Sequence, residues 1–545
     1  MGLIHLVRSE ASEHLRPLAV MTVLTSIATT SLLWVADAAA RGAQNGQANP
    51  RLLLMFVVAA VLFGVTQNYV LITASSDVER LIHRLRLRLF DAVRRSDLPT
   101  LDGIGRGALH SALTQDTQTL ARTLPMLVIG GQQAVMLVFL GLYLAWLSPI
   151  AFVCAFGFAG ISIAVRFARM QALGRLMRDA MAREIAVFDG LGDLLSGFKE
   201  VRMSRARAAG VIGDIAAASD ESRRTKTGMK AQWGREFALL QSLFYALIGL
   251  MVFVVPLFAT GYSEVVIPAT MAALFIVGPV GTLAHVTPLV TETEFALANI
   301  AALEDRLMRA ADGAVDETAV ALPAPPQTLR FRDAMFTYRD AAGEAAFTVG
   351  PLTAEFHAGE ITFITGGNGS GKSTMLRLLT GLMPLSQGAI QVDGVALAAE
   401  QRQSYRDHIT AIFSDFHLSR RLYGVRDPQP HRVQNLLERY ELAGKTRLAE
   451  GAFSTVELST GQRKRLALVV AELADKPIIV LDEWAADQDP HFRRDFYETI
   501  LPGLKASGKM VICVTHDDRW FGLADRVYHL TEGRIESDRG VYAQD

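Results

Sequence analysis

The sequence predicts a multi-domain membrane protein, in which an all-α domain of six membrane-spanning helices precedes a soluble α/β domain. Three observations support this fold class. Long apolar runs are confined to residues 1–310, mixed sequence with periodic charge fills residues 329–545, and a strand-like segment in this second part leads into a glycine-rich loop. The length of 545 residues exceeds the usual domain size several times, so at least two cores are expected.

Six apolar runs are long enough to cross a bilayer, whose hydrocarbon core of about 30 Å needs about 20 residues of helix. They are residues 17–37, 52–74, 126–146, 149–168, 238–259 and 266–290. One such run could be a buried helix of a large soluble protein, but six of them indicate a membrane domain. Only Leu147, Ser148 and Pro149 lie at the junction of the third and fourth runs, which predicts a tight helical hairpin.

Basic residues predict the orientation, because Lys and Arg resist translocation and collect in cytoplasmic loops. Residues 75–125 and 169–236 are rich in arginine. The loops at 38–50 and 260–265 contain a single basic residue, Arg41. We therefore expect a multi-pass protein of a bacterial-type inner (cytoplasmic) membrane with both termini in the cytoplasm. Helical apolar spacing in the basic segments predicts that the membrane helices extend well into the cytoplasm.

The net charge, the cysteines and the low-periodicity segments narrow the expected partners and the domain boundaries. The formal net charge is -1, without the basic excess typical of nucleic-acid binders, so no nucleic acid is expected as a partner. Cys154 and Cys513 lack any disulfide or metal-ligand spacing and are interpreted as core residues. The start of the chain has no small-residue cleavage site after a short apolar core, so no cleaved signal peptide is expected. Residues 311–328 contain a proline-rich stretch and are predicted to be a linker.

The glycine-rich loop has the pattern of a phosphate-binding P-loop. A strand-like segment at 360–365 leads directly into Gly366, Gly367, Asn368, Gly369, Ser370, Gly371, Lys372, Ser373 and Thr374. In such a loop the backbone N–H groups surround an anion and the following helix adds its positive end. Lys372 would then reach the terminal phosphates of ATP, and the Ser373 hydroxyl would bind Mg²⁺.

A second strand-like run, residues 477–481, ends in the two carboxylates of Asp482 and Glu483. Asp482 is predicted to hold Mg²⁺, and Glu483 to polarise the attacking water. The alternative is that two carboxylates at a strand end are only surface charge. The preceding P-loop favours the catalytic interpretation.

Between these elements lies Leu458-Ser459-Thr460-Gly461-Gln462, followed by a helix rich in alanine and leucine. Here the sequence closely resembles the ABC transporter family. The resemblance implies that Ser459, Thr460, Gly461 and Gln462 contact ATP bound to the opposite subunit. It also implies that Tyr338 stacks on adenine, that Asp489 ends a dimer-contact loop, and that His516 is the switch histidine beside Glu483. ATP and Mg²⁺ are the expected cofactors, and hydrolysis coupled to transport is the expected activity.

Two positions depart from the family pattern. Thr460 replaces a signature glycine, and the segment around Ser414 and Asp415 lacks the glutamine that usually couples Mg²⁺ to the membrane domain. Ser414 or Asp415 is a candidate for that role. Glu483 and His516 are both present, so ATP hydrolysis is still expected.

A narrower resemblance, to exporters of cyclic peptides and peptide siderophores of the pyoverdine and syringomycin type, rests on the segments 461–468, 482–490, 515–519 and 198–202. It implies export of a cyclic peptide, lipopeptide or peptide siderophore by alternating access. A signature that acts on the opposite subunit implies a homodimer, embedded in a lipid bilayer. Contacts between the ATPase domain and the membrane helices are expected near residues 103–108 and 188–198.

Polar residues inside the predicted spans are candidates for cargo contacts, because burying them in a membrane is costly. They are Gln67, Asn68, Gln132, Gln133, Gln241 and His285. The alternative interpretation, which we prefer, is that each bonds a neighbouring helix. A lipid or drug exporter is the main alternative function, and an ATP-gated sensor or channel is a less favoured one. An importer or a soluble ABC ATPase disagrees with the fused architecture.

Overall fold

The structure is a computed structural model that describes residues 12–44, 49–258, 266–309, 320–339, 344–425 and 427–540. The chain forms two compact units, Met1–Asp91 with Arg106–Asp305, and Ala92–Gly105 with Arg306–Asp545. Residues 311–319 of the predicted linker and 260–265 of the predicted outer loop lie outside the described residues.

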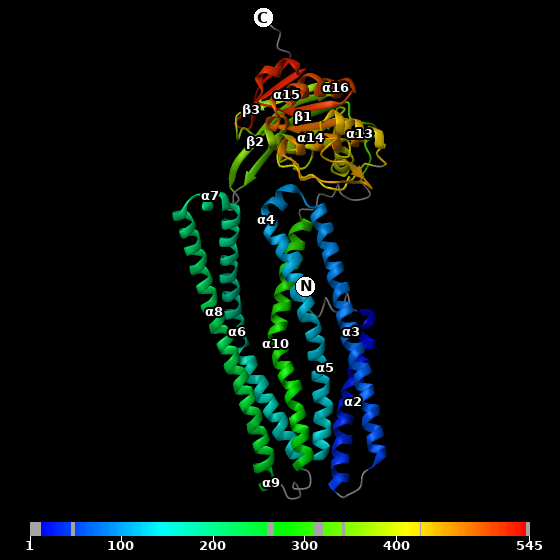
Figure 1. Ribbon diagram of the computed structural model, residues 1–545, viewed down its shortest axis with the longest axis vertical. Helices are drawn as coiled ribbons and strands as arrows, with labels where there is room; N and C mark the ends of the chain where they lie inside the picture. The colour runs from blue at the N-terminus through cyan, green and yellow to red at the C-terminus, as the bar shows by residue number, and fades with distance from the viewer. Residues whose placement is uncertain are drawn as a thin grey trace. The chain divides into compact units, whose positions relative to one another are not determined.

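The first unit is built from long helices that run side by side (Figure 1). The helices of the N-terminal part of the chain are α2 (Ser12–Gln44), α3 (Pro50–Arg95), α4 (Leu98–Ser111), α5 (Thr117–Leu147), α6 (Pro149–Ser196), α7 (Phe198–Met203), α8 (Arg205–Gly249), α9 (Val255–Phe258) and α10 (Val266–Arg309). At 1.5 Å per residue, the 46 residues of α3 span about 70 Å, roughly twice the hydrocarbon thickness of a bilayer. This helix is therefore long enough to extend beyond a bilayer, and its extension into the cytoplasm stays a prediction.

Five helical segments among the described residues are long and apolar enough to cross a membrane. They are Arg16–Gly42, Pro50–Arg95, Gly107–Leu147, Arg205–Val254 and Val266–Arg309. The sixth predicted span, 149–168, coincides with the start of α6, where the described apolar part, Pro149–Ile161, is shorter than a span. Length and composition therefore support five of the six predicted spans.

The predicted hairpin between the third and fourth apolar runs is present. Ser148 ends α5 and also caps α6, where its hydroxyl accepts a hydrogen bond from the Ala151 N–H at 3.3 Å. Pro149 occupies the first turn of α6, where its missing N–H costs nothing. Alanines at the start of α6 and α10 pack with leucines of α5 in one buried cluster, because small residues allow helices to approach closely.

The second unit contains two β-sheets. Its strands are β1 (Thr328–Arg339), β2 (Ala345–His357), β3 (Ile361–Gly366), β4 (Gln387–Val392), β5 (Val395–Ala396), β6 (Ile409–Ile412), β7 (Leu448–Ala449), β8 (Ala452–Phe453), β9 (Ile478–Asp482), β10 (Met510–Val514), β11 (Arg526–Thr531) and β12 (Arg534–Gly540). One sheet has the order β2-β1-β4-β5 and the other β12-β11-β3-β10-β9-β6, while β7 and β8 form a separate pair. In the larger sheet, β11, β3, β10, β9 and β6 are parallel.

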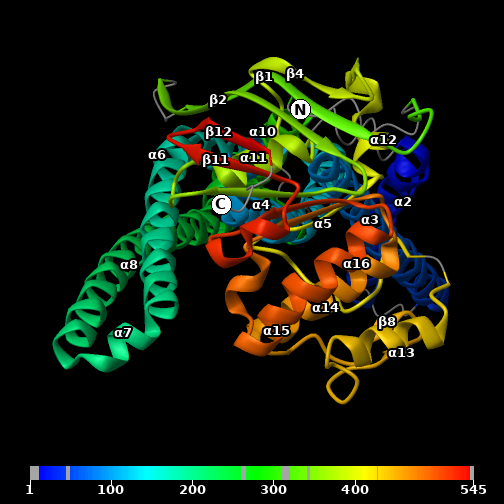
Figure 2. The ribbon, with the colours of Figure 1, turned by 90° about the horizontal axis from the view of Figure 1, so that it is seen from above.

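The larger sheet is buried on both faces, as parallel sheets usually are. Alternate residues of β9 point to opposite sides, so that Ile479 and Leu481 join one buried cluster and Ile478 and Val480 join the other. The helices of this unit are α11 (Lys372–Leu379), α12 (Arg402–Arg406), α13 (Pro430–Arg439), α14 (Thr460–Ala474), α15 (Pro490–Asp495) and α16 (Leu501–Ala506). Figure 2 shows α13 to α16 grouped together on one side, apart from β1, β2 and β4.

Candidate functional site

The parallel strands of the larger sheet bring the predicted site residues to one edge. Val514 at the end of β10 pairs with Asp482 at the end of β9, and β10 pairs in parallel with β3, which leads into the P-loop. Because the carboxyl ends of parallel strands meet at the same edge, the segments that follow them converge. The P-loop, Glu483, His516 and Ser414 all follow such strand ends.

The P-loop is shaped by a close approach of two backbone segments. Gly366 has a φ of 140°, and a Cβ atom there would lie 2.2 Å from the Leu530 carbonyl oxygen. The buried Lys372 ammonium donates to the carbonyl oxygens of Gly366 at 3.1 Å and Gly367 at 2.9 Å. The buried Ser370 hydroxyl has no hydrogen-bond partner within the described part of the chain. An unsatisfied hydroxyl and a lysine inside a glycine loop fit a phosphate group, which would supply acceptors for both.

Ser373 and Asp482, the predicted Mg²⁺ ligands, lie together. The Ser373 hydroxyl donates to a carboxylate oxygen of Asp482 at 3.1 Å. Burial raises the pKa of Asp482, while hydrogen bonds from Ser373 and Ser414 lower it and the charge of Glu483 raises it further. Oxygen ligands of this kind suit Mg²⁺. Of the two replacement candidates, Ser414 reaches Asp482, whereas Asp415 lies 4.0 Å from Arg377.

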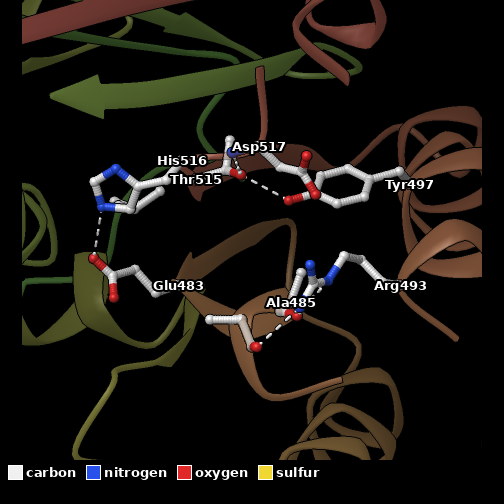
Figure 3. A pocket seen from close by; sticks show the side chains of 9 residues that line it. Glu483, Ala485, Arg493, Tyr497, Thr515, His516 and Asp517 are labelled. Atoms are coloured by element: carbon white, nitrogen blue, oxygen red, sulfur yellow. Dashed lines mark hydrogen bonds and ion pairs between the residues drawn. The ribbon is translucent and has the colours of Figure 1, made fainter. Parts of the chain in front are cut away.

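Glu483 and His516 point toward each other (Figure 3), with His516 Nε2 3.1 Å from Glu483 Oε1. Glu483 has a φ of 47°, a left-handed conformation that costs a non-glycine residue about 1–2 kcal/mol. Such conformations persist where surrounding contacts hold them, and they are common in active sites. Both side chains line a pocket of about 320 Å³, together with Ala485, Ala486, Arg493, Tyr497, Val514, Thr515 and Asp517.

Tyr338 lies in β1, near the first helix after the P-loop. Its hydroxyl is 3.1 Å from the Thr374 hydroxyl, and its ring meets Phe336 edge to face with centroids 4.9 Å apart. The aromatic ring is half-buried. The structure therefore brings Tyr338 to Thr374 of the P-loop helix, and its stacking on adenine stays a prediction.

The signature segment occupies a helix N-terminus, as predicted. Ser459 caps α14: its hydroxyl accepts from the Gln462 N–H at 3.4 Å, and the Gln462 side chain accepts from the Ser459 N–H at 3.3 Å. Ser459 and Thr460 are exposed. Within residues 344–425 and 427–540, no recorded hydrogen bond or ion pair joins residues 459–462 to the P-loop. The signature therefore forms the N-terminus of α14, with Ser459 and Thr460 at the surface of its own domain.

Sequence reasoning assigned no role to several charged residues that connect α14 to the segment after β9. The Lys464 ammonium is 2.7 Å from Asp487 and donates to the Glu483 carbonyl oxygen at 2.8 Å. Arg465 bonds Gln488 at 2.9 Å and also pairs with Asp489, the predicted end of the dimer-contact loop. The sequence did contain a signal for these contacts, namely the Lys464-Arg465 pair inside an apolar helix. Because buried charges nearly always have partners, such a pair indicates ion pairs with another segment.

In the membrane unit, two of the polar candidates bond each other and one contacts an aromatic ring. The Gln132 amide of α5 donates to the Gln67 side chain of α3. His285 of α10 and Trp233 of α8 have ring centroids 5.8 Å apart. These contacts agree with the interpretation that such residues join neighbouring helices. Asn68 and Gln241 are exposed and Gln133 is half-buried.

Comparisons with known proteins agree with this geometry. The family model described as ABC transporter matches residues 349–486, and the one described as ABC transporter transmembrane region matches residues 19–277. The chain is 31% identical over 470 residues to the ATP-binding protein SyrD of Pseudomonas syringae pv. syringae, covering 84% of this chain and 83% of the relative.

Two further matches concern an export protein and a solved structure. The probable syringafactin export ATP-binding/permease protein SyfD of Pseudomonas syringae pv. syringae (strain B728a) is 30% identical over 221 residues, which are 37% of this chain and 33% of that protein. The structure of a bacterial Atm1-family ABC exporter with ATP bound superposes with a TM-score of 0.74 at 18% identity, covering 98% of this chain and 95% of that one. At this identity the likeness shows the fold alone.

The raised pKa of Asp482 generates a prediction about stability. An acid whose pKa is higher in the folded than in the unfolded protein lowers the free energy of unfolding. This destabilisation is complete when the pH is above the folded-state pKa, and it is absent when the pH is below the unfolded-state pKa. We expect Asp482→Asn to raise the melting temperature of the nucleotide-free, full-length protein at pH 8, with a difference from wild type that shrinks as the pH falls toward the ordinary aspartate pKa of 3.8. Calorimetry in detergent with EDTA measures this. A melting temperature of the Asp482→Asn protein below that of wild type at pH 8 would contradict the prediction.

Proposed function

This chain belongs to the ABC transporter family, with membrane and ATPase domains fused in one exporter polypeptide, and we propose that it exports a peptide-like cargo. The cargo class is a cyclic peptide, lipopeptide or peptide siderophore. The observation that carries the proposal is similarity along 84% of the chain to SyrD, together with the match to a protein named for syringafactin export.

The ATPase domain supplies the groups that hydrolysis needs. ATP phosphates would lie in the P-loop, where Lys372 exchanges the carbonyls of Gly366 and Gly367 for phosphate oxygens. Ser373 and Asp482, with Ser414 nearby, would hold Mg²⁺, which when bound neutralises developing phosphate charge. These residues supply the oxygen atoms that such a cation requires.

Glu483 is placed to act on water. In this proposal its carboxylate accepts a proton as the water oxygen bonds to the γ-phosphorus and the bond to the β–γ bridging oxygen breaks. His516, 3.1 Å from the Glu483 carboxylate, orients that group. The ADP and phosphate that form leave the site, and their release allows the domains to separate.

A second copy of the chain would complete each site. The exposed Ser459 and Thr460 at the N-terminus of α14 can bind the γ-phosphate of ATP held by a partner, since a helix N-terminus attracts anions. In the proposed homodimer, ATP clamps two ATPase domains together and hydrolysis reopens them, which would move the membrane helices between inward and outward access. The grouping of Ala92–Gly105 with the ATPase domain supports coupling near residues 103–108.

The proposed location is a bacterial-type inner membrane, with both termini in the cytoplasm. Arginine-rich segments at 75–125 and 169–236 support this orientation through the positive-inside rule. In this orientation the long helices that carry these segments would leave the bilayer at their basic ends.

Two buried acceptor oxygens in the membrane unit support a cargo that carries N–H groups. Among the residues that the structure describes, Glu236 Oε1 of α8 and Gln132 Oε1 of α5 have no hydrogen-bond partner, and Glu236 is only 8% exposed. Glu236 lies two residues before the predicted span 238–259, and a buried carboxylate oxygen without a partner is costly. An ammonium, guanidinium or amide of a peptide would satisfy them. A lipid or drug exporter remains the alternative, and it differs only in what stimulates ATP hydrolysis.

The first test is ATP hydrolysis by the protein in lipid vesicles with and without cyclic or siderophore-like peptides. We expect peptides to stimulate hydrolysis, and Glu483→Gln to reduce both basal and stimulated rates by ~100-fold or more, because the amide cannot accept the proton of water. Stimulation by lipids or drugs but not by peptides would contradict the cargo class. Wild-type hydrolysis that the substitution leaves intact would contradict the role of Glu483.

The cargo site has its own test. Glu236→Gln should raise the concentration of a cationic peptide needed for half-maximal stimulation by ~10-fold, about 1.4 kcal/mol of binding, and leave basal hydrolysis unchanged. Glu221→Gln is the matched control, because Glu221 lies on the same helix but is exposed and paired with Arg183 at 3.5 Å. Equal effects of the two substitutions would contradict a cargo contact at Glu236.

A further inference from the structure

Lys464 is a buried lysine whose contacts all lie beside the proposed catalytic glutamate. Its side chain is 5% exposed, on the helix α14 that begins with the signature residues. A lysine is rarely buried unless its ammonium is paired. Here the ammonium meets one carboxylate, Asp487 at 2.7 Å, and one carbonyl, that of Glu483 at 2.8 Å.

The Glu483 peptide unit is held in its left-handed conformation by a small number of hydrogen bonds. Its N–H donates to the Val514 carbonyl at 3.2 Å, and its carbonyl accepts from the Ala486 N–H at 3.3 Å. Lys464 provides the shortest bond of the set, at 2.8 Å. The Lys464 bond comes from helix α14, whereas the other two bonds come from the neighbouring strand and from the local turn.

The next residue, Trp484, also bonds Lys464, but here the lysine is the acceptor. Its indole N–H donates to the Lys464 carbonyl at 2.9 Å. The indole ring is completely buried and stacks on Phe496 with centroids 4.5 Å apart. Lys464 therefore contacts residues 483 and 484 through both its ammonium and its carbonyl, so that α14 and the turn after β9 are fixed to each other.

We propose that Lys464 is a positioning residue for Glu483: its ammonium fixes the Glu483 backbone, so that the carboxylate faces the water that attacks ATP. The proposal rests on the hydrolytic role of Glu483 in the proposed function, but it does not depend on the cargo. Because Lys464 lies five residues after Ser459 on the chain, it links the signature, which would bind the partner's ATP, to the glutamate of its own subunit. ATP at one site thereby stabilises the hydrolytic geometry at the other.

The test compares two buried lysines with similar partners. Lys509 donates to Asp475 at 2.7 Å and to the Lys476 carbonyl at 2.9 Å, and it immediately precedes β10, at the edge of the sheet opposite the site. Lys464→Met and Lys509→Met each remove a buried ammonium from one carboxylate and one carbonyl. Both are expected to lower the melting temperature, so stability alone does not separate them.

Basal ATP hydrolysis of the full-length protein in lipid vesicles, without peptide, provides the separating measurement. We expect Lys464→Met to lower kcat by ~10-fold or more with the KM for ATP within ~2-fold of wild type, and Lys509→Met to leave kcat within ~2-fold. Lys464→Arg, which keeps a cationic donor, should recover most of the lost kcat.

Two results would overturn the proposal. One is a kcat within ~2-fold of wild type for Lys464→Met. The other is a similar loss of kcat in both methionine variants, which would assign Lys464 a purely structural role. Failure of peptides to stimulate hydrolysis would contradict the cargo class alone, because the basal rate is measured without them.

Discussion

The parallel register of β3, β10, β9 and β6 determines where the chemistry of this protein lies. β3, β9 and β10 are buried along their whole length and β6 is partly buried, so charged residues that the reaction requires are expected at strand ends. Because the strands point the same way, those ends share one edge. The P-loop lysine, the Asp482–Ser373 pair and the Glu483–His516 pair all depend on that alignment.

The loop, the carboxylates and the histidine come from strand ends, but the signature comes from the N-terminus of α14, where Ser459 bonds Gln462 and both Ser459 and Thr460 face solvent. In the proposed homodimer, this exposed N-terminus of α14 would bind the phosphate of an ATP molecule held by the other subunit. In our account, Lys464 and Trp484 then connect that helix start to Glu483 within each subunit.

Local patterns predicted much of this arrangement, because they have direct physical causes. Glycines at 366–371 and carboxylates after an apolar strand are required by phosphate chemistry, and Ser148-Pro149 is a helix start in any context. The partners of Lys464 and Arg465 were not predictable, since they belong to a segment 19 to 24 residues further along the chain. It was likewise not predictable that Ser414 contacts Asp482 whereas Asp415 lies near Arg377. The span at 149–168 was predicted from composition, but the described apolar part of α6 is shorter than a bilayer requires.

The central claim is that each ATP site is completed by a second copy of the chain, and disulfide cross-linking tests it most directly. Two differently tagged chains would be co-expressed, one with Asn368→Cys and the other with Ser459→Cys, both carrying Glu483→Gln and alanine in place of Cys154 and Cys513. The account predicts an ATP-dependent disulfide that joins the two tagged chains. It would be contradicted if the chains bind ATP without forming that link, or if a chain carrying both cysteines forms it internally.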